Sequence, residues 1–400
     1  MTEQILCVML AYGEGRELEP LTRRRPKAAV PFGGNYRVID FPLSNCLRSG
    51  IRRILVLTQY RSHSLHKHLR DGWSIFNPEL DEFVTAVPPQ GHNGGHGYRG
   101  GADALHQTID LIERNSDREV LVLSGAQIYR MDYAAMAAFH REQGAEVTLA
   151  CIRCREDEQL PPVPGVEMDA GGRIRSLTPP GEGDRWRFME IALFERDLLV
   201  EALRRDAADP GSGHDLSGDL IPALVREHRV MGYEFGAASG RVTPDRYWQK
   251  LCSLDDYYRS NMDLLRTDSP LEMYQPDWPI RSYRSQTPPA RTVPGHSSNE
   301  GLFVNSMVAG GTVIAGGGVN HSILFPNVFV DDGGIVEDAI LFPGVRVGEG
   351  ARLHHCIVEE DVVIPAGEQI GVDPERDRER FLVTEGGVVV VTADSFGGEE

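Results

Sequence analysis

The stretch that decides the fold is residues 321–370, HSILFPNVFVDDGGIVEDAILFPGVRVGEGARLHHCIVEEDVVIPAGEQI. Apolar residues recur in it every six positions, a period that fits neither a helix nor a simple alternating strand. The register comprises Ile323, Phe329, Ile335, Leu341, Val347 and Leu353, preceded by Leu302, Val308 and Ile314 and followed, after a slip of one, by Val358, Ile364 and Ile370. This period predicts a parallel β-helix, whereas an antiparallel sandwich would show a period of two with wider turn spacing.

Upstream of the repeat, strand-like and helix-like segments alternate. Short β-rich runs cover residues 4–10, 52–58, 118–124 and 145–152, and residues 101–115 show helical apolar spacing. Alternation of this kind predicts right-handed βαβ units and a mostly parallel sheet. The first run leads into AYGEGRELEPLT, a glycine-bearing turn at the position where nucleotide folds bind phosphate, although two glycines alone are a weak signal.

A change of composition separates the two parts. Residues 274–301 contain five prolines and little periodicity, which is typical of an ordered linker lying over a surface. We therefore expect an α/β domain over residues 1–273, a proline-rich linker over 274–300 and the β-helix over 301–400.

Bulk composition narrows the function classes. The chain has 400 residues, 41% of them apolar, and a net charge of −18 that argues against nucleic acid or an anionic membrane as partner. It has no basic leader followed by a long apolar segment, and no run of eighteen uncharged apolar residues, so we expect a soluble cytoplasmic protein.

The cysteines and one basic run are weak signals. Six scattered cysteines fit a reducing compartment, and the lone pair Cys151 and Cys154 is more simply a strand end than a redox or zinc site. The run LTRRRPKAAV at residues 21–30 would by itself be interpreted as a solvated charged turn.

The specific strings of the chain resemble the bacterial ADP-glucose pyrophosphorylase family. The match includes AAVPFGGNYRVIDFPLSNCLRSGIRRILVLTQYRSHSLHKHLRDGW (28–73), YRGGADAL (98–105), IYRMDY (128–133), HDLSGDLIP (214–222), MYQPDWPIRSY (273–283), PPAR (288–291) and GGVVVVT (386–392). The resemblance implies a Rossmann-like nucleotidyltransferase domain followed by a left-handed parallel β-helix of hexapeptide repeats. It also implies a tetramer that transfers AMP from ATP to glucose 1-phosphate with Mg²⁺, releases pyrophosphate and responds to sugar-phosphate effectors.

The positions that hold Mg²⁺ in the family are changed. The family string A-G-D-H-I-Y has become SGAQIY, which places Ala126 at the first metal aspartate. The family string Y-W-R-D-V-G-T has become YWQKLCS, which places Lys250 at the second. Mg²⁺ is held through carboxylates and phosphate oxygens, so the resemblance predicts a pocket with an ammonium and no acid to hold the ion, unless a neighbour such as Asp132 or Asp255 compensates.

Other family positions for substrate are changed as well. Tyr12 replaces a glycine of the phosphate loop, Glu17 replaces its arginine, and Glu14 adds negative charge. The sugar-phosphate motif E-K-P aligns with LTPP, and S-M-G-I-Y-V-F aligns with FMEIALF. The altered positions in these strings are Thr178, Pro179, Phe188 and Glu190, and Gly97 stands where the family has a tryptophan.

A second group of positions still matches the family. The ligand-binding candidates are Lys27, Gln59, Tyr98, Gly165 and Asp215. The effector-binding candidates are Arg24, Arg25, Arg37 and Arg380, with Pro31 departing from the histidine of some relatives. Guanidinium groups from two domains would suit phosphate oxygens, and the simpler alternative is that these arginines only hold the domain interface together.

Three functional hypotheses follow from this pattern. The favoured one is a catalytically deficient regulatory subunit that assembles with an active paralogue in glycogen or α-glucan synthesis. The second is a free-standing homotetrameric sensor of a phosphorylated sugar or nucleotide, and the third is an active glucose-1-phosphate adenylyltransferase with displaced ligands. No cofactor is expected, and Mg²⁺ would be required only by the active enzyme.

Overall fold

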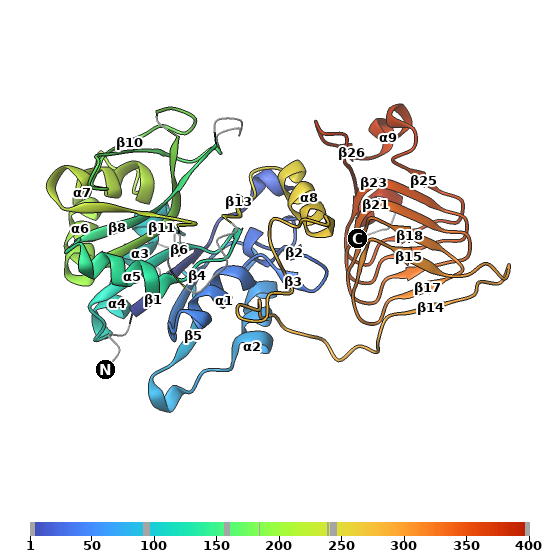
Figure 1. Ribbon diagram of the computed structural model, residues 1–400, viewed down its shortest axis with the longest axis horizontal. Helices are drawn as coiled ribbons and strands as arrows, with labels where there is room; N and C mark the ends of the chain where they lie inside the picture. Colours follow the sequence, from blue (N-terminus) through green and yellow to red (C-terminus); the bar gives the residue numbers. More distant parts are fainter. Residues whose placement is uncertain are drawn as a thin grey trace.

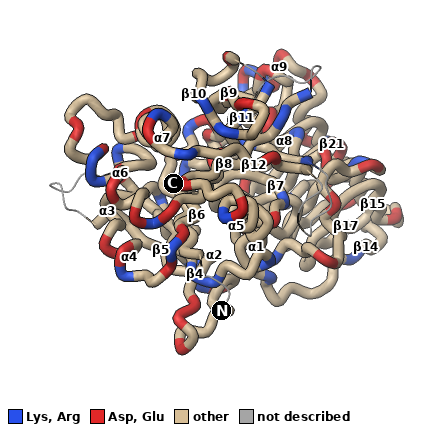
Figure 2. The backbone as a smooth tube through the Cα atoms, turned by 60° about the vertical axis from the view of Figure 1, so that its left-hand side comes forward, with Lys and Arg blue, Asp and Glu red and all other residues tan. Residues whose placement is uncertain are grey.

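The computed structural model describes residues 5–90, 97–155, 161–183, 185–237, 240 and 246–396. An α/β domain occupies the first two-thirds of the chain and a stack of short parallel strands the last quarter (Figure 1). Basic and acidic positions are interspersed along the backbone rather than separated onto two faces (Figure 2). None of the helices in the described part of the chain is long and apolar enough to cross a membrane.

The first domain is built on one large twisted sheet. Its strands, in sheet order, are β10 (Ile174–Thr178), β9 (Gly165–Met168), β11 (Trp186–Glu195), β6 (Glu119–Ser124), β1 (Ile5–Ala11), β4 (Arg53–Thr58) and β5 (Phe83–Val87), with β8 (Val147–Arg153) beside β11 and β12 (Val230–Glu234) beside β8. Strands β6, β1, β4 and β5 are parallel, and β11 runs antiparallel to β6 and β8. The four predicted β-rich runs and the α/β fold class are confirmed.

Helices cover both faces of this sheet because successive residues of β1 point to opposite sides. The helices are α1 (Asp40–Arg48), α2 (His63–Trp73), α3 (Gly101–Gln107), α4 (Ile109–Arg114), α5 (Tyr133–Glu142), α6 (Arg196–Ala208), α7 (Ile221–Glu227) and α8 (Leu254–Met262). Cys7 and Met9 pack in the cluster that includes residues of α1, α2 and α5, whereas Leu6 and Val8 pack in the cluster that includes residues of α3, α4, α6 and α7.

The helical segment predicted over residues 101–115 is two helices. The break falls at Thr108, whose hydroxyl donates to the carbonyls of Ala104 and Leu105. Hydroxyl groups that bond back to the preceding turn compete with the helical ladder, which explains the interruption.

The C-terminal domain is a parallel β-helix, as predicted. One face consists of β14 (Arg291–Val293), β17 (Val313–Ala315), β20 (Phe329–Val330), β22 (Arg346–Val347) and β24 (Val363–Ile364). The other faces consist of β15 (Leu302–Val304), β16 (Met307–Val308), β18 (Gly318–Asn320), β19 (Ile323–Leu324), β21 (Ile335–Leu341), β23 (Arg352–Val358), β25 (Gln369–Ile370), β26 (Leu382–Val383) and β27 (Val389–Val391). Helix α9 (Pro374–Arg380) lies near its end.

The inward register differs from the predicted one at three places. The core contains Val330 and Val336, whereas Phe329 and Ile335 are only half-buried and Leu302 is exposed. Strand pairs join Phe329 to Arg346 and Arg346 to Val363, so one coil takes 17 residues rather than 18. Each coil therefore contains one step of five and two of six, which is the origin of the slip seen in the sequence.

The β-helix packs on the first domain through a second apolar row. Ile323, Ile340 and Ile357 point outward, stacked in successive coils, and are fully buried. They belong to one cluster with Leu254 and Tyr257 of α8. Ile323 therefore belongs to the domain interface and not to the β-helix core that the hexad pattern predicts.

The segment between the domains lies over the first domain. Trp278 donates through Nε1 to Asn45 Oδ1, and Ser282 donates to Asp40 Oδ2. Strand β14 already pairs with β17 inside the predicted linker, so the β-helix sheet begins at Arg291.

Candidate functional site

A cavity of about 240 Å³ lies at the carboxyl ends of β1 and β6, where open α/β sheets bind ligands. We call it the strand-end cavity. Its lining consists of Leu10, Ala11, Tyr12, Gly13, Gly15, Glu17, Lys27, Ala28, Gly101, Ser124, Ala126, Glu190, Asp215, Leu216 and Ser217. Many of the positions that the resemblance assigns to substrate thus meet here.

The two altered metal positions are brought together by a small sheet. Strand β13 (Trp248–Lys250) pairs with β7 (Gln127–Tyr129), and Lys250 lies opposite Gln127, the residue after Ala126. The expectation that Lys250 has no acid beside it is wrong, because its Nζ lies 2.7 Å from Glu190 Oε1. The ammonium at the former metal position is neutralised by another altered residue.

Gln127 extends this ion pair into a chain of hydrogen bonds. Its Nε2 donates to Glu190 Oε2 over 3.0 Å, and its Oε1 accepts from Trp248 Nε1 over 3.1 Å. Gln127 is completely buried, so its amide needs both partners. Ala126, Gln127, Glu190 and Lys250 therefore form one satisfied unit in place of metal ligands.

Glu190 adopts a backbone conformation that favours glycine. Its φ is +58°, at a register shift of β11 between Phe188 and Ala192. The resemblance places a glycine at this position, and a residue with a side chain is strained in it. The glutamate thus holds its ion pair from a strained backbone.

A second ion pair lies within the cavity. Lys27 Nζ is 2.7 Å from Glu17 Oε1, and Lys27 is buried. Burial raises the pKa of Glu17, but the attraction of Lys27 outweighs it and the pKa is lowered overall. The lysine retained from the family is therefore engaged by the glutamate that replaces the phosphate-binding arginine.

Tyr12 closes the cavity beside the glycine turn. Its ring meets Tyr98 edge to face, with centroids 5.5 Å apart. Burial, followed by the charges of Asp215, Glu190 and Asp103, raises the pKa of Tyr12 to about 12. The phenol is therefore neutral at physiological pH and offers a hydroxyl rather than a charge.

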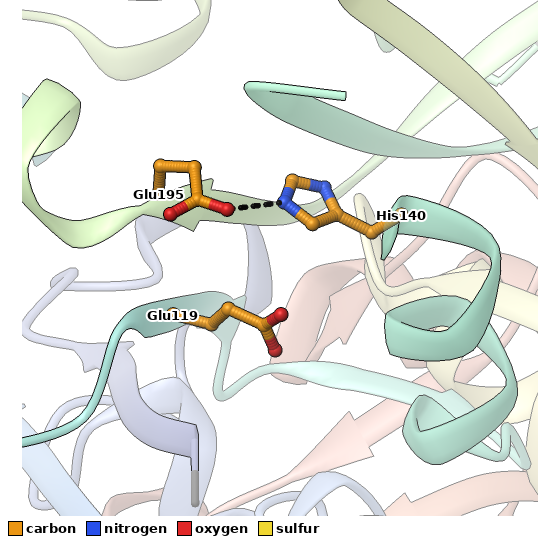
Figure 3. Close-up of side chains that lie close together, drawn as sticks. All are labelled: Glu119, His140 and Glu195. Atoms are coloured by element: carbon orange, nitrogen blue, oxygen red, sulfur yellow. Dashed lines mark ion pairs between the residues drawn. The ribbon is translucent and has the colours of Figure 1, made fainter. Parts of the chain in front are cut away.

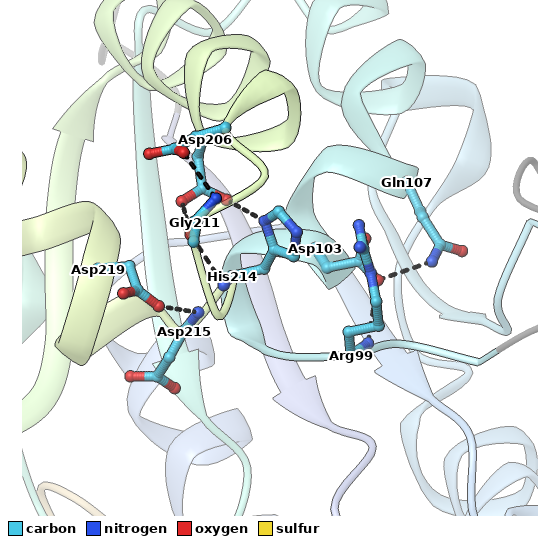
Figure 4. A network of polar contacts seen from close by, with 10 residues as sticks. Arg99, Asp103, Gln107, Asp206, Gly211, His214, Asp215 and Asp219 are labelled. Atoms are coloured by element: carbon cyan, nitrogen blue, oxygen red, sulfur yellow. Dashed lines mark hydrogen bonds and ion pairs between the residues drawn. The ribbon is translucent and has the colours of Figure 1, made fainter.

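Asp215 is held in a polar network at the edge of the cavity (Figure 4). Its Oδ1 accepts from the backbone N–H groups of Ser217 and Gly218, and its own N–H donates to Asp219 Oδ2. His214 contacts Asp206 through Nδ1 over 2.8 Å. The Asp215 carboxylate is thus committed to the turn that it caps.

Several other expected site residues lie outside the cavity lining. Glu14 is exposed and accepts from Arg16, and Phe188 is buried in the hydrophobic core. Gly165 pairs with Thr178 across β9 and β10, where a Cβ would overlap the threonine hydroxyl, and Pro179 is exposed. Gln59 accepts through Oε1 from the N–H of Tyr98, on the space left by Gly97.

The possible substitute acids also lie elsewhere. Asp132 Oδ1 caps α5 by accepting from the Ala134 N–H. Asp255 accepts from Thr384 and from the Gly386 N–H of the β-helix. The carboxylates that do line the cavity are paired with lysines or cap a turn, so this donor set does not fit Mg²⁺.

The four effector candidates divide into two groups. Arg25 is buried between the domains, 2.8 Å from Glu360 and 3.7 Å from Glu359. Arg37 donates to the Ala29 carbonyl, and burial followed by the charge of Arg25 lowers its pKa. Arg24 is exposed.

Arg380 is bound within its own domain. It donates twice to the Glu368 carboxylate, at 2.8 and 3.0 Å. No contact in the described part of the chain joins Arg380 to the arginines near the N-terminus. The predicted convergence of all four arginines is therefore not seen within one chain.

Cys151 and Cys154 provide no site for chemistry. Cys151 is fully buried in β8, where it donates to the Leu149 carbonyl, and burial raises the pKa of its thiol. A thiol of this kind is inert.

Comparison with known proteins places this geometry in a family. Residues 6–267 match the nucleotidyl transferase family model, and residues 288–391 match the GlmU-like C-terminal hexapeptide model. A glucose-1-phosphate adenylyltransferase 2 of Vibrio cholerae is 48% identical over 97% of this chain and 98% of its own. Two proteins of Alkalilimnicola ehrlichii, glucose-1-phosphate adenylyltransferases 1 and 2, are 42% and 40% identical, each over the whole of this chain and 96% of its own.

Proposed function

The chain belongs to the glucose-1-phosphate adenylyltransferase family, and we propose that it is a catalytically deficient, regulatory member of it. In this proposal it binds a sugar-phosphate or nucleotide effector and assembles as a tetramer with an active paralogue in glycogen or α-glucan synthesis. The observation that carries the proposal is the 2.7 Å contact between Lys250 and Glu190 at the position where the family holds Mg²⁺.

The charges around the strand-end cavity oppose a metal–triphosphate complex. Glu17, Glu190 and Asp215 contribute three negative charges, and Lys27 and Lys250 contribute two positive ones, a sum of −1. Phosphoryl and nucleotidyl transfer needs cations that neutralise the developing charge on phosphate oxygens. Both lysines are already neutralised, and the acids that would attract Mg²⁺ are engaged.

The regulatory role is supported by what the chain keeps. The scaffold of both domains is intact, and Arg25 and Arg37 lie near each other at the domain boundary. Arg24 is exposed beside them, so an effector phosphate has a guanidinium within reach. The two numbered enzymes of Alkalilimnicola ehrlichii indicate that paralogue pairs occur in this family.

A pyrophosphate-release assay with ATP and glucose 1-phosphate tests the catalytic part. We expect no turnover above background with either Mg²⁺ or Mn²⁺. Turnover that disappears in the Glu190→Gln variant would instead establish an active enzyme with displaced ligands.

Co-expression with an active paralogue from the same genome tests the regulatory part. We expect a mixed tetramer by light scattering, and a shift in its effector response when Arg24 is changed to alanine. Two separate homo-oligomers, or a mixed tetramer with the effector response of the paralogue alone, would refute this part.

A second candidate is the free-standing sensor, because Lys27 and Lys250 place two ammonium groups at the cavity. A phosphosugar that displaced Glu17 and Glu190 would bind them without a divalent ion. Calorimetry with glucose 1-phosphate and with ATP distinguishes this candidate, since its binding would be unchanged by a chelator.

A further inference from the structure

A second polar cluster lies at the opposite end of β6 from the strand-end cavity. It consists of Glu119 at the start of β6, Glu195 at the end of β11 and His140 in the last turn of α5 (Figure 3). Glu119 and Glu195 are paired neighbours on antiparallel strands. One ligand atom from each of the three side chains lies within 4.8 Å of the other two.

The imidazole of His140 is incompletely satisfied. The side chain is 1% exposed, and its Nδ1 contacts the hydroxyl of Thr148 over 2.8 Å. Its Nε2 is buried, has no hydrogen-bond partner within the described residues, and points at Glu195 Oε1 from 3.5 Å. A buried polar atom aimed between two carboxylates in this way calls for a ligand.

The Thr148 contact suits a metal-binding tautomer. When Nδ1–H donates to the threonine hydroxyl, Nε2 carries a lone pair directed at the two carboxylates. Two acceptors facing each other repel unless a cation lies between them. Burial, listed first among the influences on it, lowers the pKa of His140 and favours the neutral ring.

Arg141 does not fill the cluster. Its Nε and Nη2 donate to the two oxygens of Glu119, each over 2.6 Å. Each carboxylate oxygen has a further lone pair, so Glu119 can accept from Arg141 and still coordinate an ion. Arg141, Glu119 and Glu195 together carry a charge of −1 beside a neutral His140, which favours a divalent cation.

We propose that Glu119, His140 and Glu195 form a binding site for a first-row divalent metal, Zn²⁺ in particular. One imidazole and two carboxylates suit Zn²⁺, with water in the fourth position on the side where Glu195 is half-exposed. The bound ion would tie the end of α5 to β6 and to Glu195, which precedes α6. The site is separate from the strand-end cavity, so it does not depend on the proposed function.

Equilibrium dialysis of the untagged full chain against Zn²⁺ tests the site, with metal content as the readout. We expect about one Zn²⁺ per chain, and at least about a tenfold loss of affinity in Glu195→Gln and in His140→Gln. The matched controls are Glu201→Gln, an exposed acid on α6, and His354→Gln, an exposed histidine of the β-helix, and both should bind as the unaltered chain does.

Cobalt substitution gives a second readout that does not depend on the His140 variant folding. Co²⁺ in the four-coordinate site should show visible absorption that Glu195→Gln removes and Glu201→Gln keeps. The proposal is overturned if the unaltered chain binds no Zn²⁺, or if all variants bind it equally, because the ion would then sit on other histidines.

Discussion

Breaking the Lys250–Glu190 pair tests whether the altered cavity is held together by its own charges. The perturbation is a double-mutant cycle with Lys250→Met, Glu190→Gln and the two combined. Each single change leaves the other partner charged and without its counter-ion, whereas the combined change removes both charges and keeps most of the side-chain volume.

The expected magnitude follows from the geometry. At 2.7 Å and an effective dielectric of about 20, two unit charges attract each other with about 6 kcal/mol. Both side chains are about a quarter exposed, 24% and 26%, so water screens the attraction and loss of hydration offsets much of the rest. We therefore expect a coupling free energy of about 1–2 kcal/mol, between the values of surface pairs and buried pairs.

The assay is urea denaturation of all four proteins at neutral pH and low salt, monitored by tryptophan fluorescence. Trp248 lies two residues from Lys250 and donates to Gln127, so its emission reports on this part of the first domain. The coupling should shrink in high salt. Single losses that simply add in the double variant, with a coupling below about 0.3 kcal/mol, would refute the reasoning.

Three further predictions concern single positions. At Glu190, with φ of +58°, glycine should be more stable than alanine by about 1 kcal/mol, the reverse of the usual order, as thermal unfolding of the two variants would show. For Glu17, burial raises the pKa but Lys27 lowers it further, below its ordinary 4.5; the pair therefore stabilises fully above pH 4.5 and is lost as the pH falls through the folded pKa, an acid-limb slope that Glu17→Gln should flatten. Arg25→Ala should lower the free energy of unfolding by about 2–4 kcal/mol by leaving buried acids unpaired, whereas exposed Arg24→Ala should change it by less than about 0.5 kcal/mol in the same denaturation assay.

The fold could be predicted from the sequence because its repeat is regular. The hexad pattern identified the β-helix even though the true coil of 17 residues averages slightly less than six per face. The register was misplaced where two apolar residues are adjacent, as at Phe329 and Val330, since a pattern of apolar letters cannot say which one points inward. The outward row at Ile323 was missed for the same reason.

The site could be predicted only in part. The pairing of β7 with β13 brings the two altered metal positions together, as the resemblance implies. The contact of Lys250 with Glu190 was missed because each change was considered against the family alone, although an acid gained together with a base gained is a usable signal. The Glu119, His140 and Glu195 cluster draws on three distant segments, and no local spacing announces it.

The altered cavity is better described as rebuilt than as decayed. Loss of function by unselected substitutions would leave polar groups buried without partners, at about 1–3 kcal/mol each. Here Lys250 Nζ, both oxygens of Glu190 and both amide atoms of Gln127 are all satisfied by one another or by Trp248. Glu190 also keeps a strained φ that glycine would relieve, and this strain is tolerable only if the ion pair offsets it. Lys250 and Glu190 are therefore interdependent, and restoring an aspartate at one metal position alone would unpair a charge without recreating a site for Mg²⁺.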